Sequence, residues 1–131
     1  MRYLLDANVI IGLLRDDRSP LARRARHERL EDMSTSSIVI HELLFGAFKS
    51  QRPASNLAIF DSLKFAVLDF DRDDARQAGL IRADLTRHGA PIGPYDVLIA
   101  GQAVARNLIL VTRNTREFGR VSGLRIENWE A

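Results

Sequence analysis

The sequence contains no cysteine and only two lysines, Lys49 and Lys64. Without thiols the protein cannot form a disulfide, a thiolate metal site or a cysteine nucleophile, and this composition suits a reducing compartment. Nineteen residues are lysine or arginine, so the positive charge is carried almost wholly by arginine. Guanidinium groups suit phosphate contacts, but an arginine-rich coding bias gives the same pattern, so charge alone does not establish a nucleic-acid partner.

Long hydrophobic runs are also missing. No apolar stretch approaches the roughly 20 residues that cross a bilayer. The short apolar run Val9–Leu14 follows Asp6 rather than a basic segment, and no small-residue cleavage site comes after it, so it is not a signal peptide. We therefore expect a cytoplasmic protein without a membrane partner, folded as one domain over residues 1–131.

Several catalytic signatures are absent. The sequence has no G-x-S-x-G elbow, no P-loop and no G-x-G-x-x-G. His27, His41 and His88 show no zinc-ligand spacing. His41 precedes Glu42, but neighbours on a helix point about 100° apart, so we expect His41 to pack or to support the site from outside it.

Strand-like and helix-like segments alternate along the chain. Apolar runs predict strands at residues 2–5, 65–69, 108–112 and 124–127, with a short polar strand or turn at 34–36. Helical periodicity, capping residues and proline predict helices over 8–15, 19–31, 37–49, 53–62, 71–88 and 95–106, the first capped by Asn8. This alternation is typical of a parallel sheet covered by helices on both faces, in which ligands bind at the carboxyl ends of the strands.

Four polar residues stand where such a fold places its chemistry. Asp6 and Asn114 follow predicted strands, Glu42 lies inside a predicted helix, and Asp96 falls in the first turn of another. With Pro94 at the first helical position, the helix dipole favours an ionised Asp96 by roughly 0.3–1 kcal/mol. Each residue alone has an ordinary structural role as a cap, surface or turn residue. Together they are typical of a Mg²⁺ site that hydrolyses phosphodiester bonds.

At these residues the chain resembles the VapC-type toxins of the PIN-domain family. The resemblance is carried by YLLDANVIIGLL around Asp6, TSSIVIHELLFGA around Glu42, the stretch from GAPIGPYD to LVTRNTREFGRV, and the closing GLRIENW. It spans nearly the whole chain, and PIGPYD and LVTRNTREF are its most specific parts. It implies a three-layer α/β/α sandwich with a central, mostly parallel sheet.

The resemblance also implies an endoribonuclease dependent on Mg²⁺ or Mn²⁺. Asp6 and Asp96 would be the principal metal ligands, and Glu42 would bind metal directly, bind it through water, or orient the attacking water. Asn114 stands where many members have a fourth acid, which leaves a second metal ion open, and Glu117 is a possible substitute. Thr112, Arg113 and Arg116 would support the site or contact RNA.

The resemblance implies two protein partners as well. A VapB-type antitoxin would lay its C-terminal segment in an apolar groove, for which Leu13, Leu14, Phe45, Phe48 and Phe60 are candidates. A second copy would form a homodimer. Two other functions stay open: a catalytically inactive PIN-like module that binds RNA, and a phosphatase of the haloacid dehalogenase type. Against the latter, Asp6-Ala7-Asn8 lacks the second acid of the Asp-x-Asp pair of those phosphatases.

Overall fold

Five parallel strands form one central sheet in the computed structural model, which describes residues 1–130. They are β1 (Tyr3–Leu5), β2 (Met33–Ser36), β3 (Ala66–Leu68), β4 (Ile109–Val111) and β5 (Ile126–Glu127). Their order is β3-β2-β1-β4-β5, and every adjacent pair is parallel. Strands β2 and β3 follow β1 toward one edge of the sheet, and β5 follows β4 toward the other. The crevice between β1 and β4 is therefore the point where a parallel sheet binds its ligand.

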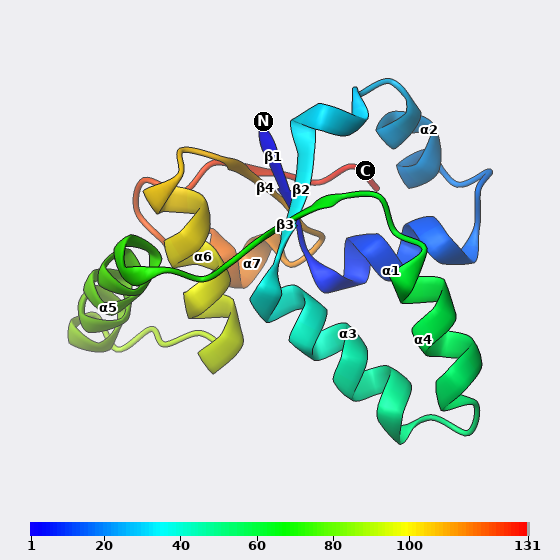
Figure 1. Ribbon diagram of the computed structural model, residues 1–131. Coiled ribbons are helices and arrows are strands. Elements are labelled where there is room, and N and C mark those ends of the chain that lie inside the picture. Colours follow the sequence, from blue (N-terminus) through cyan, green and yellow to red (C-terminus); the bar gives the residue numbers. More distant parts are fainter. Residues whose placement is uncertain (131) are drawn as a thin grey trace.

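Helices lie on both sides of this sheet. The α-helices are α1 (Ala7–Arg15), α2 (Pro20–Arg26), α3 (Ser37–Lys49), α4 (Pro53–Asp61), α5 (Arg72–Arg87), α6 (Pro94–Ala105) and α7 (Thr115–Phe118), and Leu30–Asp32 forms a 3-10 turn. Figure 1 shows α5 and α6 on one side of the sheet and α1, α2 and α4 on the other. This arrangement confirms the predicted α/β/α sandwich. Within residues 1–130, no helix combines the length and apolar character that a membrane span requires.

The three inner strands, β2, β1 and β4, are buried along their whole length. Strand β2 is bound to β1 by side chains as well as by its backbone. The Ser34 hydroxyl donates to the Tyr3 carbonyl at 2.7 Å, and the Thr35 hydroxyl donates to the Leu5 carbonyl at 3.0 Å. Both side chains are almost fully buried, and a buried hydroxyl needs such a partner. The polar sequence of β2 is thus compatible with a place next to the centre of the sheet.

Two local predictions were wrong, and one helix was not predicted. The N-cap of α1 is Asp6, whose carboxylate accepts from the Ala7 amide at 2.8 Å, because the helix begins directly after β1 and leaves Asn8 inside it. Helix α2 ends at Arg26 rather than near residue 31, since the chain turns there to reach β2. The short α7 was not predicted, because a single turn shows no periodicity.

Helices α5 and α6 pack with almost no gap between their backbones. A Cβ atom added to Gly101 of α6 would lie 2.5 Å from the Ala78 backbone nitrogen of α5. No real Cβ contact is that short, and the obstacle is backbone, which cannot rotate away. Glycine at this position therefore sets the distance between the two helices.

We expect Gly101→Ala to lower the free energy of unfolding by about 2–3 kcal/mol or more, because the helices must separate. Urea unfolding followed by circular dichroism measures this change. Gly79→Ala is the matched control, since a Cβ there meets nothing within 4 Å. It should be neutral or stabilise the protein by up to about 1 kcal/mol. Equal effects of the two substitutions would contradict the close packing.

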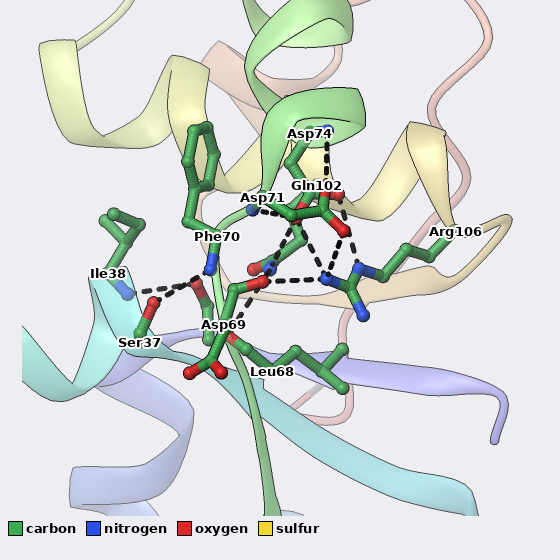
Figure 2. Close-up of polar contacts among 10 residues, drawn as sticks. Ser37, Ile38, Leu68, Asp69, Phe70, Asp71, Asp74, Gln102 and Arg106 are labelled. Atoms are coloured by element: carbon green, nitrogen blue, oxygen red, sulfur yellow. Dashed lines mark hydrogen bonds and ion pairs between the residues drawn. The ribbon is translucent and has the colours of Figure 1, made fainter.

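A buried polar network joins the same helix pair next to the contact between Gly101 and Ala78 (Figure 2). The Asp74 carboxylate of α5 accepts from the Gln102 amide at 3.1 Å and from the Arg106 guanidinium at 3.0 and 3.2 Å. Gln102 and Arg106 also donate to the Asp69 carbonyl, which follows β3. Hydrogen bonds from Arg106 hold the pKa of Asp74 below its ordinary value, although burial opposes them. The network joins α6 to the sheet edge and so orients the helix that carries Asp96.

Candidate active site

Asp6 lies at the carboxyl end of β1, in the crevice between β1 and β4. Its Oδ1 accepts from the Ala7 amide at 2.8 Å, and its Oδ2 accepts from the Thr112 hydroxyl at 2.8 Å. The side chain is only 6% exposed. Burial raises its pKa above the ordinary value, whereas the two hydrogen bonds and the positive charge of Arg113 partly offset that rise. Asp6 is thus held rigidly at the strand end by the backbone of α1 and by the residue after β4.

Asp96 stands in the first turn of α6, at the third helical position as the sequence predicted. Gly93 leaves room for it, because a Cβ there would lie 3.1 Å from Asp96 Oδ2. The pKa of Asp96 is raised to about 6. Burial is the largest cause, and the negative charges of Asp6 and Glu117 add to it. These charge effects place Asp96 close to acids from two other segments.

Glu42 projects from α3 into the same region. Burial raises its pKa to about 7, with further contributions from the charges of Asp6 and Asp96. Its Oε1 is buried and finds no hydrogen-bond partner among residues 1–130. An unpartnered buried acceptor costs free energy, and natural structures rarely keep one without a reason. A cation or a water bound at this oxygen is such a reason.

Glu117 is a fourth acid beside these three, and Asn114 hydrogen-bonds to it. Asn114 Nδ2 donates to Glu117 Oε2 at 3.1 Å, while the Asn114 amide donates to the Thr112 hydroxyl at 3.0 Å. Since the charge of Glu117 raises the pKa of Asp96, this carboxylate lies beside the cluster. The sequence suggested Glu117 only as a substitute for the missing acid at position 114. The spacing of three residues within α7 now shows how one side chain orients the other.

The remaining predicted residues divide by exposure. Thr112 is 1% exposed and donates to Asp6, which agrees with the first of its two predicted roles, support of the site, rather than with contact to RNA. Arg113 and Arg116 are exposed beside it and remain accessible to a ligand. The His41 ring packs on Tyr95 with ring centroids 5.3 Å apart, as expected for a residue outside the acid cluster.

The donor set fits a hard divalent cation. Carboxylate oxygens are its preferred ligands, and one or two of them suffice for Mg²⁺, which keeps several waters. Within residues 1–130 no three acidic or histidine side chains converge tightly enough to ligate one ion together. The acids are nevertheless close enough to raise the pKa values of Glu42 and Asp96, a repulsion that a cation would relieve. Asp6 and Asp96 with water, and Glu42 at its unpartnered oxygen, are therefore suitable ligands.

Comparison with known proteins identifies the family of the chain and relatives that match nearly its whole length. Residues 3–124 match the model of the PIN domain family. The chain is 44% identical to the tRNA(fMet)-specific endonuclease VapC of Shigella flexneri, over 98% of both chains. It is 39% identical to the ribonuclease VapC2 of Haemophilus influenzae, again over 98% of both. Ribonucleases with this domain generally depend on a divalent metal ion.

Solved structures agree with the sequence relatives. The fold superposes with a TM-score of 0.93 on a chain of the DNA-bound VapBC complex of Salmonella typhimurium, which is 41% identical over 98% of both chains. It superposes with a TM-score of 0.85 on a chain of the FitAcB structure of Neisseria gonorrhoeae, 27% identical over 97% of both.

Proposed function

The chain belongs to the PIN-domain family and, within it, to the VapC-type ribonucleases, and from this we propose that it cleaves RNA at the cluster of Asp6, Glu42 and Asp96 with Mg²⁺. It is an endoribonuclease and the toxin of a toxin–antitoxin pair. The observation that carries the proposed site is the buried, unpartnered Oε1 of Glu42 beside Asp6 and Asp96 at the crevice between β1 and β4. Mn²⁺ is an alternative ion, because it accepts the same oxygen ligands.

The residues of the site would have different roles in phosphodiester hydrolysis. Asp6, held by Thr112, and Asp96, held at the helix N-terminus, would bind the cation. When bound, the cation supplies charge that attracts the phosphate, activates water and stabilises the developing negative charge on phosphorus. Glu42, with an unpartnered oxygen and a pKa of about 7, would orient the attacking water and accept its proton. Glu117 and Asn114 would complete the cluster, and Arg113 and Arg116 would contact RNA phosphates.

The substrate class follows from the sequence relatives. Proteins 44% and 41% identical to this chain are named tRNA(fMet)-specific endonucleases, so we propose a transfer RNA as the substrate. Because that substrate is found in the cytoplasm, we place the activity there. An inactive RNA-binding module is not favoured, since such a module has no use for acids that destabilise one another. Neither is a phosphatase of the haloacid dehalogenase type, because Asn8 leaves Asp6 without its acidic partner.

The antitoxin has a suitable surface on helices α1, α3 and α4. Apolar side chains stay exposed on three helices: Leu14 at 40%, Phe45 at 61%, Phe48 at 63% and Ile59 at 45%. A pocket of about 230 Å³ between α1 and α4 includes Leu14, Ile59 and Phe60. Exposed apolar area of this kind marks a protein-binding surface. We propose that a VapB-type antitoxin segment lies here and extends a cation toward the acids, and that the toxin forms a homodimer.

Cleavage of a fluorogenically labelled transfer RNA tests the function. We expect the purified protein to cleave it in Mg²⁺ and to lose this activity in EDTA, with recovery on adding Mg²⁺ back. A chromogenic phosphate monoester serves as the control substrate and should remain intact. Hydrolysis of the monoester without cleavage of RNA would reject a ribonuclease, and cleavage that persists in EDTA would reject the metal.

A further inference from the structure

A second pocket, of about 360 Å³, lies between α1, the start of α2 and the residue after Thr112. We call it the Arg15–Arg113 pocket. Asn8 and Arg15 line it from α1, Ser19 and Leu21 from the start of α2, and Arg113 from the loop after β4. It adjoins the acid cluster, because Asn8 comes two residues after Asp6 and Arg113 follows the residue that donates to Asp6.

Within residues 1–130, the two arginines of this pocket have no protein partner. Neither guanidinium forms an ion pair or a side-chain hydrogen bond with any residue of the described chain, whereas Arg24, Arg29 and Arg106 do. Both side chains are exposed, and the charge of Arg113 reaches Asp6. Unpaired guanidiniums beside a phosphodiester-cleaving site are suited to bidentate contacts with phosphate.

The rest of the lining suits a nucleobase. Ile11 and Leu21 give the pocket apolar walls, and the Asn8 amide offers both a donor and an acceptor at its rim. Gly12 forms part of the floor, because a Cβ there would lie 2.8 Å from Leu21 Cδ2. The volume lies within the range of small-molecule sites, about 300–1,000 Å³. Phosphate donors and a half-apolar recess together match one nucleotide.

We propose that the Arg15–Arg113 pocket binds the nucleotide of the RNA substrate that adjoins the scissile phosphate, with its own phosphate on the two arginines and its base in the recess. This inference rests on the proposed function, because it gives the RNA a path from the acid cluster over α1. It assigns to Arg15 and Asn8 a role in substrate binding that the acids do not require, and Arg15 is shared with the pocket of the antitoxin surface.

Asp16 and Glu130 line the same pocket with a charge of the wrong sign for phosphate, and Glu130 makes the proposal sharper. Its Oε1 would lie 3.8 Å from a Cβ at Gly12, so the carboxylate reaches toward the floor. A bound phosphate would be repelled by it. Removing this charge should therefore have the opposite effect on RNA binding from removing either arginine, which a purely structural role of these residues does not predict.

The test measures binding of a fluorescein-labelled, single-stranded RNA of ten nucleotides by anisotropy, in Ca²⁺ and over a series of salt concentrations. We expect Arg15→Gln and Arg113→Gln each to weaken binding about tenfold. Each should also reduce the slope of log K against log salt by about 0.7. Glu130→Gln should tighten binding severalfold. Arg76→Gln is the matched control, because Arg76 is an exposed arginine of α5, and it should change nothing.

Cleavage of the labelled transfer RNA in Mg²⁺, followed in parallel, separates the two proposals. If RNA is cleaved while Arg15→Gln and Glu130→Gln bind like Arg76→Gln, the pocket is overturned and the proposed function stands. If the predicted binding changes appear but RNA stays intact in Mg²⁺, the pocket stands and the proposed function fails. Thermal melting of each variant checks that a loss of binding does not come from a loss of folding.

Discussion

Replacing Asp96 by asparagine is expected to lower the rate of RNA cleavage by roughly 10²–10³-fold. Asparagine keeps the size of the side chain but removes the charge that would hold the cation, and a metal ion contributes several kcal/mol to such a reaction. The substitution should not lower the stability of the fold, because burial and the charges of Asp6 and Glu117 already disfavour the ionised carboxylate. Single-turnover cleavage measures the rate, and circular dichroism verifies the fold.

Asp73→Asn is the matched control for this experiment. Asp73 also lies in the first turn of a helix, α5, but it is exposed and distant in sequence from the acid cluster. Its replacement should leave cleavage within about twofold of the wild type. The cleavage rate of Thr112→Val should lie between the rates of these two variants, about 10–100-fold below the wild type. Residues that orient metal ligands have effects of this size. An Asp96→Asn protein that still cleaves at the wild-type rate would remove Asp96 from the site.

Replacing Glu42 by glutamine is expected to abolish most cleavage yet to stabilise the metal-free protein at alkaline pH. The folded-state pKa of Glu42 is about 7, compared with an ordinary value of 4.5. Because the folded state holds this proton more tightly than the unfolded state, stability falls as pH rises from about 4.5 and the loss is complete above about 7. Glutamine cannot ionise and does not share the loss. Since the side chain is only partly buried, we expect a gain of about 1–2 kcal/mol at pH 8.

Urea unfolding in EDTA at pH 4 and at pH 8 measures this gain. The variant and the wild type should be nearly equal at pH 4, where the carboxyl is protonated in both states. Glu31→Gln is the control, because Glu31 is 72% exposed and lies far from the acid cluster in the 3-10 turn. Saturating Mg²⁺ should reverse the order, since a ligand that binds the folded wild type more tightly stabilises it selectively. A variant less stable than the wild type at pH 8 in EDTA would show that Glu42 is structural.

The sequence predicted those features that depend on local pattern. The apolar runs of β1 and β4 and the period of α3, α5 and α6 located most of the fold, because burial imposes that pattern directly. Asp6 and Asp96 could be placed at a strand end and at a helix start for the same reason. Their meeting followed from the rule for parallel sheets, and the charge effects between them agree with it.

Other features depend on contacts that no local pattern encodes. Either Asp6 or Asn8 can cap a helix, and only the abrupt end of β1 decides for Asp6. Thr112 read as a possible RNA contact until its burial and its bond to Asp6, 106 positions away, were known. The pairing of Asn114 with Glu117 requires a helical turn too short to detect from sequence. The Asp74 network joins segments about 30 residues apart, and nothing in the sequence marks its members as partners.

The central claim is that the acid cluster binds a divalent cation, and electron paramagnetic resonance of Mn²⁺ tests it most directly. Free Mn²⁺ is titrated into the metal-free wild-type protein, the Asp6→Asn variant and the Asp73→Asn control at pH 7.5. We predict saturable binding by the wild type and by Asp73→Asn, greatly weakened binding by Asp6→Asn, and release of the bound Mn²⁺ by excess Mg²⁺. Equal binding by all three proteins, or no binding by the wild type, would contradict the account.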